Sequence, residues 1–269
     1  MKAHRIAMSA AALVPAVLVA GAALGDTGSA YRATASSVSS AAAGEANAAA
    51  PLASLSGKKI FLDPGHNGAN DASINKQVPT GRGGTKDCQT TGTSGDDGFA
   101  EHTFNWDVAY RLYEILEAQG AQVIFSRGDD TSVGPCVDAR AAAANKWPAD
   151  AVVSIHADGA PAADHGFHVN LSSPPLNTAQ QTSQRYATAM RDAMVSAGFA
   201  PADYIGSGGI YPRSDLAGLN LSTVPAVLVE AGNMKNADDE KVMNSADGQQ
   251  RIAQALADGV AAFLGGATK

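Results

Sequence analysis

Short apolar runs alternate with longer segments of helical periodicity from residue 58 onward, and this alternation constrains the fold more than any other feature. Apolar runs of this length are typical of buried strands, and strands separated by helices are typical of parallel sheets. The pattern predicts an α/β fold, a single domain with a twisted, largely parallel (mixed) sheet flanked by helices. The expected strands are 59–63, 122–126, 151–155, 166–170 and 226–230, and the expected helices are 102–119, 137–147, 178–197 and 249–264.

The segment 64–100 interrupts this alternation. It is polar and rich in glycine, and it predicts a long irregular loop. Loops of this length are usually functional or mobile.

The N-terminus has the pattern of an export signal, with Lys2 and Arg5 before an apolar stretch at 6–24 and small residues after it. We expect a signal peptide at 1–25, a flexible Ala- and Ser-rich linker at 26–57 and the folded domain at 58–265. An uncleaved anchor is the alternative, because the stretch is about long enough to span a bilayer. Alanine and glycine insert weakly and Pro15 interrupts the run, so we expect no stable membrane insertion.

Cys88 and Cys136 are the only cysteines. An oxidising compartment outside the cell favours a disulfide between them, which would close a loop of roughly fifty residues and contribute about 4 kcal/mol. Two free thiols or a cysteine metal ligand are the alternatives, but the pair lacks the close spacing of a zinc site.

The charge balance excludes one class of partner. The chain has 19 Lys and Arg residues against 26 Asp and Glu residues, for a net charge of −7. A nucleic-acid-binding protein would show a basic patch, so we expect no nucleic-acid partner.

Side chains that bind metals or transfer protons follow three of the expected strands. His66 comes just after the first, His156 directly follows the third and Glu230 ends the last, while Glu101 lies at the start of the first helix. Functional groups of open α/β sheets gather at the carboxyl ends of strands. Two histidines and one carboxylate are a common catalytic zinc set, and a further carboxylate can act as general base toward a water whose pKa the metal lowers to about 7.

Each of these residues also has an ordinary structural interpretation. A histidine after a strand is more often a hydrogen-bonding residue than a ligand, and Glu101 could stabilise a helix N-terminus. His102 is adjacent to Glu101, but its side chain points about 100° away on a helix, so the two should not share one metal. His165 and His168 are expected to be surface or groove residues.

Four motifs occur in a characteristic order along the chain. They are Phe61-Leu-Asp-Pro-Gly-His-Asn-Gly68, Ala100-Glu-His-Thr-Phe-Asn105, Ser154-Ile-His-Ala-Asp158 and Val229-Glu-Ala-Gly-Asn233. Together they resemble the zinc-dependent N-acetylmuramoyl-L-alanine amidases of the type 3 family. The resemblance covers about residues 58–265, and a compact, single-domain subgroup of the family also has the disulfide.

The resemblance implies Zn²⁺ as cofactor, with His66, Glu101 and His156 as ligands and Glu230 as the catalytic glutamate. The implied reaction is hydrolysis of the amide bond between N-acetylmuramic acid and L-alanine, on peptidoglycan or a soluble muropeptide. We expect a monomer that is secreted, periplasmic or located in the cell wall.

Two positions depart from the family pattern. The family usually has asparagine where this chain has Asp158, and residues 232–236 read Gly-Asn-Met-Lys-Asn in place of the usual Gly-Phe-Leu-Ser-Asn. These departures bear on peptide preference more than on the reaction. A zinc carboxypeptidase acting on the stem peptide could use the same ligands and base, and an inactive wall-binding protein is a third alternative.

Overall fold

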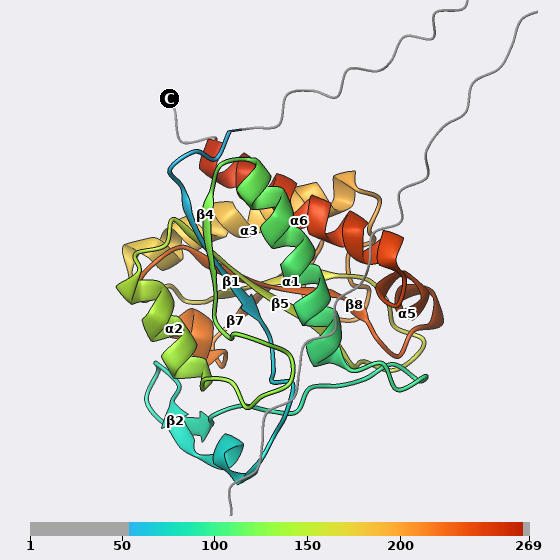
Figure 1. Cartoon of the computed structure of the whole chain (residues 1–269), viewed down its shortest axis with the longest axis horizontal. Coiled ribbons are helices and arrows are strands. Elements are labelled where there is room, and N and C mark those ends of the chain that lie inside the picture. The colour runs from blue at the N-terminus through green and yellow to red at the C-terminus, as the bar shows by residue number, and fades with distance from the viewer. Residues whose placement is uncertain (1–53, 266–269) are drawn as a thin grey trace, which may run out of the picture. The chain divides into compact units, whose positions relative to one another are not determined.

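Six strands form one mixed sheet in the part of the chain that the structure describes, residues 54–265 of a computed structural model. The order across the sheet is β4-β1-β5-β8-β6-β7 (Figure 1). The strands are β1 (Lys59–Pro64), β4 (Gln122–Phe125), β5 (Ala151–Asp158), β6 (His168–Ser172), β7 (Ile210–Arg213) and β8 (Ala226–Asn233). The expected signal peptide (1–25) and most of the expected linker (26–57) lie outside the described residues.

The first four strands of this order are parallel, whereas β6 is antiparallel to β8 and β7 runs with β6. The prediction of a largely parallel, mixed sheet is therefore confirmed. Because β1, β5 and β8 are parallel, their carboxyl ends meet at one edge of the sheet. The strand β7 was not predicted, and it contains Pro212, a residue that argues against a strand when only the sequence is read.

One face of the sheet is covered by the three long helices α1 (Glu101–Ala118), α3 (Thr178–Ser196) and α6 (Ala246–Gly265) (Figure 1). Each places a row of apolar residues toward the sheet at helical spacing. In α1 these are Phe104, Val108, Leu112 and Leu116, all fully buried. This face forms the main core of the domain.

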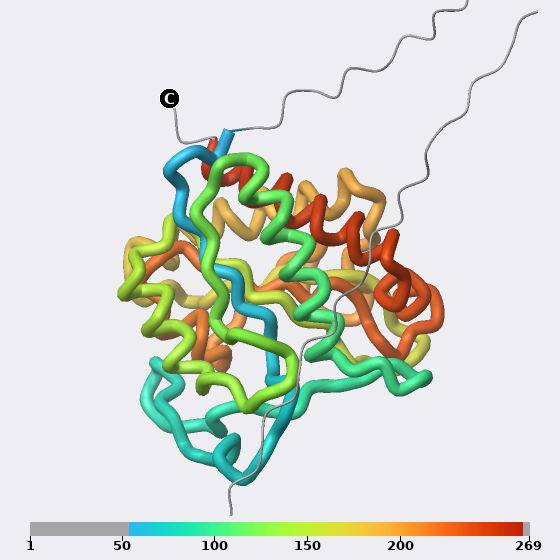
Figure 2. The backbone as a smooth tube through the Cα atoms, in the orientation of Figure 1, coloured from blue at the N-terminus to red at the C-terminus, as the bar shows by residue number. Residues whose placement is uncertain are grey.

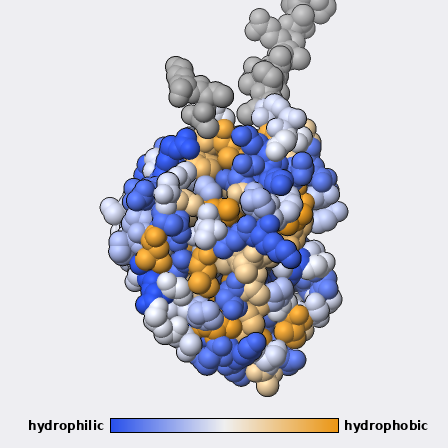
Figure 3. Space-filling view, turned by 90° about the vertical axis from the view of Figure 1, so that its left-hand side faces the viewer, coloured by the Kyte–Doolittle hydropathy of each residue, from blue (hydrophilic) through white to orange (hydrophobic). Residues whose placement is uncertain are grey.

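The other face carries only α2 (Val137–Lys146) and the single-turn α4 (Ala217–Asn220), with a smaller apolar cluster beneath them. A cavity of about 500 Å³ lies here, lined by residues of β1, β5, β8, α2 and α4. In Figure 3, which views the molecule from the side nearest α2 in Figure 1, apolar side chains appear in small groups among hydrophilic ones. The thinner cover on this face thus leaves room for a ligand.

The segment 64–100 is more ordered than the sequence predicts. It contains a 3₁₀ turn, η1 (Ala72–Asn75), and a hairpin of β2 (Gln77–Pro79) and β3 (Thr85–Asp87). In Figure 2 it runs below the carboxyl edge of the sheet, from the side of α2 to that of α5 (Ala237–Met243). The predicted disulfide joins Cys88, just after β3, to Cys136, the residue that precedes α2. This bond attaches the segment to the body of the domain.

The packed part of the chain begins before the expected boundary at Lys58. Leu55 is buried in the main core, and its amide donates to the carbonyl of Gln119 at 2.9 Å. Among the described residues, no helix has the length and apolar character needed to cross a membrane.

Candidate metal and catalytic site

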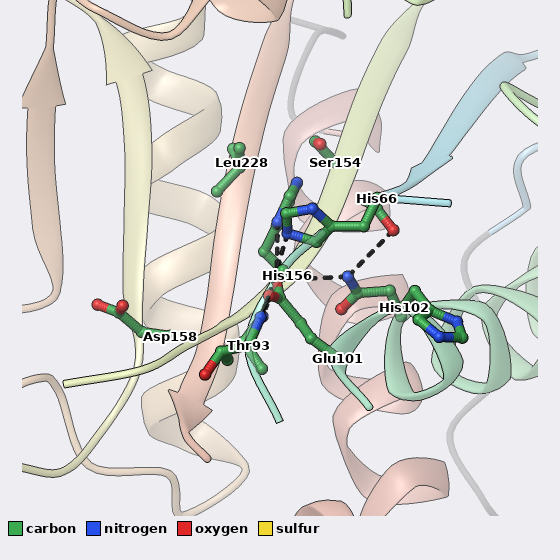
Figure 4. A network of polar contacts seen from close by, with 12 residues as sticks. His66, Thr93, Glu101, His102, Ser154, His156, Asp158 and Leu228 are labelled. Carbon is green, nitrogen blue, oxygen red and sulfur yellow. Dashed lines mark hydrogen bonds and ion pairs between the residues drawn. The ribbon is translucent and has the colours of Figure 1, made fainter. Parts of the chain in front are cut away.

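Three side chains of the predicted zinc set meet at the carboxyl edge of the sheet. His66 follows β1, His156 lies near the end of β5, and Glu101 is the first residue of α1. One ligand atom of each can be chosen so that all lie within 4.8 Å of one another. Figure 4 shows the two imidazole rings next to each other over the carboxylate of Glu101. The structure therefore brings together three elements that are far apart in sequence.

The carboxylate of Glu101 is enclosed by hydrogen-bond donors. Its Oε1 lies 2.9 Å from Nδ1 of His156 and accepts from the amide of Ala157 at 3.2 Å. Its Oε2 lies 3.0 Å from Nε2 of His66 and accepts from the amide of Thr93 at 2.9 Å. Glu101 lies in the first turn of α1, as the alternative role requires, and Nδ2 of Asn105 in the same helix lies 3.5 Å from its Oε1, but its shorter contacts are all to groups outside the helix.

The electrostatics of this cluster follow from these contacts. Burial alone would raise the pKa of Glu101, but the hydrogen bonds and positive charges of His156 and His66 outweigh it, so this pKa lies well below its usual range. Burial would likewise lower the pKa of His66, yet the hydrogen bond and charge of Glu101 raise it. The cluster therefore favours an ionised Glu101 next to a positive charge, either a protonated His66 or a metal ion.

A carboxylate oxygen and an unprotonated imidazole nitrogen repel each other at 3 Å unless a cation lies between them. A neutral imidazole carries one proton, which Nδ1 of His156 can donate to Glu101, so the need for an extra proton or a metal ion arises at His66. Nδ1 of His66 also lies 2.8 Å from the carbonyl oxygen of Thr90, which can only accept, so this nitrogen carries the proton and leaves Nε2 as the ligand atom. The donor set is one that zinc commonly takes.

The backbone around His66 is held in a rare conformation. His66 has φ = 61°, in the left-handed region that few residues other than glycine adopt. Two glycines allow the close approach of the rings: a Cβ on Gly65 would lie 2.2 Å from the ring of His156, and one on Gly92 would lie 2.8 Å from Oε2 of Glu101. The cluster thus depends on small residues as well as on the ligands.

Two buried arginines, which the sequence analysis did not identify, fix the loop that carries His66. Arg140 donates to the carbonyl oxygens of His66 at 2.7 Å and Pro64 at 2.9 Å, and it pairs with Asp63 at 2.9 Å. Arg127 donates to the same Pro64 carbonyl at 3.0 Å. Neither arginine stands in a motif, so spacing along the chain gave no signal for them.

Glu230 lies beside the cluster, because it pairs with His156 across the β5–β8 ladder. The residue as a whole is partly exposed, but its Oε2 is enclosed and has no hydrogen-bond partner among the described residues. Burial raises the pKa of Glu230 well above its usual range, and the negative charges of Glu101 and Asp158 add to this effect. The group is therefore suited to hold a proton near neutral pH.

A polar group lies on the far side of Glu230, over β6. Asp158 accepts from the hydroxyl of Tyr204 at 3.0 Å, and its carboxylate lies 3.4 Å from Nε2 of His168. The expectation that His168 is a surface or groove residue needs correction, because its side chain is only 2% exposed. It is buried because β6 lies between β8 and β7, and the sequence did not predict β7. His165 is exposed as expected.

His102 does not join the metal cluster. Its ring points away from Glu101 in Figure 4, and Nδ1 lies 2.9 Å from Oδ1 of Asp130. The helical geometry that separated the two side chains in the sequence analysis is thus confirmed.

Comparisons of the sequence and of the structure with known proteins all find amidases of one family. The sequence profile of the N-acetylmuramoyl-L-alanine amidase family matches residues 60–262. An N-acetylmuramoyl-L-alanine amidase of Mycobacterium tuberculosis is 55% identical over 219 residues, which cover 81% of this chain and 91% of that protein.

Solved structures agree with this match. The crystal structure of the N-acetylmuramyl-L-alanine amidase Ami1 of Mycobacterium smegmatis has a TM-score of 0.79 at 56% identity, covering 79% of this chain and 99% of that one. An N-acetylmuramoyl-L-alanine amidase of Clostridium difficile 630 is more distant, with a TM-score of 0.62 at 25% identity, covering 78% of this chain and 98% of that one.

Proposed function

Because the chain belongs to the N-acetylmuramoyl-L-alanine amidase family, we propose that it cleaves the bond between N-acetylmuramic acid and L-alanine with zinc held by His66, Glu101 and His156. Glu230 acts as general base and then as general acid. The observation that carries this assignment is the pair of carboxylates at one sheet edge. One is shared between two imidazoles, and the other has an oxygen for which residues 54–265 provide no hydrogen-bond partner.

Zinc held by His66, Glu101 and His156 would supply Lewis-acid chemistry, a polarised lactyl carbonyl and a more acidic water. The protein groups supply the rest. Glu230 accepts a proton from the water and passes it to the nitrogen of the departing L-alanine. Its raised pKa suits both steps, since a base that must return its proton should bind it near the working pH.

The surrounding residues position these groups. Thr93 and Ala157 donate amide hydrogens to the carboxylate of Glu101, which orients it toward both rings. Arg140 donates to the backbone carbonyl of His66, and the carbonyl of Thr90 contacts Nδ1 of its ring, so both the backbone and the ring of this residue are held. Such outer contacts set the direction and tautomer of metal ligands.

A zinc carboxypeptidase acting on the stem peptide would use the same groups, but the family match and the close relatives do not favour it. Mass spectrometry of a digested muropeptide distinguishes the two reactions. The amidase releases an intact peptide that begins with L-Ala, and a carboxypeptidase would shorten that peptide at its other end. Failure to release the L-Ala peptide from any muropeptide would contradict the proposed reaction and favour the inactive wall-binding alternative.

We also place the protein outside the cytoplasm, as a secreted, periplasmic or cell-wall monomer. The domain order would be a signal peptide at 1–25, a linker at 26–57 and the amidase domain at 58–265. The disulfide between Cys88 and Cys136 supports this location, because such bonds persist in oxidising compartments. N-terminal sequencing of the exported protein tests the processing, and its elution volume in gel filtration tests the monomer.

A further inference from the structure

Asp158 lines the same cavity as Glu230 and has its side-chain contacts on the side away from the metal cluster. The metal cluster lies over β1 and β5, Glu230 lies on β8, and the contacts of Asp158 lie on the next strand, β6, and on Tyr204. Glu230 gives its proton to the departing nitrogen in the proposed reaction, on which this inference rests. A leaving peptide that extends from Glu230 on the side opposite the metal cluster would pass Asp158.

An irregularity in the sheet lies next to Asp158. His156 pairs with Glu230, but Asp158 pairs with Asn233, so β8 has one more residue than β5 between these pairs. Bulges of this kind bend the strand that carries the extra residue, here β8, and are common beside active sites. In Figure 4 the carboxylate of Asp158 points away from the rings of His66 and His156. It nevertheless lines the same cavity as they do.

The hydrogen bonds of Asp158 leave one acceptor position free. A carboxylate has about four lone-pair positions. The amide of Gly159 takes one on Oδ1 at 2.7 Å, and Tyr204 and His168 take two on Oδ2 at 3.0 and 3.4 Å. Within residues 54–265, no lysine or arginine lies at ion-pair distance from this carboxylate, and its side chain is 35% exposed. The group is held in place and can still accept from a ligand.

We propose that Asp158 is a specificity-determining residue that accepts a hydrogen bond from an N–H donor of the leaving stem peptide. The residue after L-Ala in peptidoglycan is a D-glutamate whose α-carboxyl is free or amidated, and a diamino acid follows it. A primary amide on the second residue or the ammonium of the third offers such a donor. A free carboxylate is repelled by the charge of Asp158, because an ionised carboxylate can only accept.

The test uses synthetic N-acetylmuramoyl tripeptides in two matched pairs. One pair differs only in an amidated or free carboxyl on the second residue, and the other only in a free or acetylated amine on the third. We expect the zinc enzyme to prefer the donor form in one pair by about 10- to 100-fold in kcat/KM, the size expected for one hydrogen bond to a charged group. The pair that shows the preference identifies the donor.

The variant Asp158→Asn should reduce this preference to below about threefold, mainly by raising KM for the donor form. Tyr204→Phe, which removes one contact that positions Asp158, should reduce it less. Asp203→Asn is the matched control, because Asp203 is an exposed acid adjacent to Tyr204 and pairs with His165. It should leave the preference unchanged.

Two results would overturn the assignment: equal kcat/KM within both pairs for the unaltered enzyme, or an equal loss on all four substrates in Asp158→Asn. Both differ from a failure of the proposed function, in which the unaltered enzyme would release no L-Ala peptide from any of the four.

Discussion

The surroundings of Glu101 and Glu230 differ although the two carboxylates lie in one cavity. Both oxygens of Glu101 accept from amides and face imidazole nitrogens, and its pKa lies well below the usual range. Glu230 has an enclosed oxygen with no hydrogen-bond partner in the described part of the chain, and burial raises its pKa well above that range. A permanent anion suits a metal ligand, whereas a group that binds a proton suits a general base.

The difference comes from where the chain places each group. Glu101 starts a helix beside the segment 90–93, whose free backbone groups reach both its carboxylate and His66. Glu230 lies within the strand β8, between β5 and β6, where the neighbouring amides are used by the sheet. Two side chains of the same type thus differ in their chemistry because their local surroundings differ. The following predictions test that contrast.

The largest effect should come from removing a ligand on the Glu101 side. His66→Ala or His156→Ala should lose most bound zinc and all measurable activity, because three protein ligands are the usual set of a catalytic zinc site. His165→Ala is the control, since that ring is exposed. Zinc content by atomic emission, measured with the rate, checks this. Full zinc occupancy in both variants would refute the ligand assignment.

The hydrogen bond from Arg140 to the backbone carbonyl of His66 can be removed without substituting any of the three ligands. Arg140→Ala should lower the free energy of unfolding by about 3–5 kcal/mol, because it leaves Asp63 as a buried charge without its partner. Zinc affinity should fall as well, since the carbonyl of His66 loses its donor. Lys146→Ala, exposed on the same helix, should change neither. Urea unfolding with and without zinc measures both effects, and a loss below 1 kcal/mol would contradict them.

The disulfide holds the segment that supplies Thr90 and Thr93 to the Glu101 side. Reduction, or the double change of Cys88 and Cys136 to Ser, should cost about 2–4 kcal/mol and lower Tm. The three ligands would remain, so zinc should stay bound in the folded protein. Calorimetry and zinc content on the same sample check this. Two free thiols in exported protein, found by mass measurement, would disprove the bond.

The smallest effect concerns acid stability. Burial would raise the pKa of Asp63, but the charge of Arg140 and hydrogen bonds from Ser126 and Ser154 lower it overall. A lowered pKa contributes stability that is complete above the unfolded value of about 3.9 and is lost as the pH falls through the folded value. Asp63→Asn should be less stable at neutral pH and lose less on acidification. Unfolding curves from pH 6 to pH 2 measure this, and parallel losses would contradict it.

The sequence predicts the position of site residues that follow an apolar run, near the carboxyl end of a strand. It does not predict residues that support the site through contacts distant in sequence. His66, His156 and Glu230 each follow an apolar run, so parallel strands bring them to one edge, and the helix register separated Glu101 from His102. Arg127 and Arg140 carry no such signal, because their partners lie far away in sequence.

The segment 64–100 and the region around β7 were the hardest to predict. Their order comes from the disulfide, from short pairings and from contacts such as the 2.7 Å hydrogen bond between the amide of Asp96 and Glu240. None of these leaves a periodic pattern in the sequence. The burial of His168 was missed for the same reason, since it depends on the neighbouring strand β7.

The contrast between the two carboxylates is tested most directly by zinc stoichiometry, Tm and turnover on Glu230→Gln and Glu101→Gln, prepared in parallel. Glu230→Gln should keep its zinc while turnover falls by about 10²- to 10⁴-fold, the range for a lost general base. Glu101→Gln should lose zinc affinity and activity together. Loss of zinc from Glu230→Gln, or near-normal turnover in that variant, would contradict the assignment, as would parallel losses of Tm and activity in both.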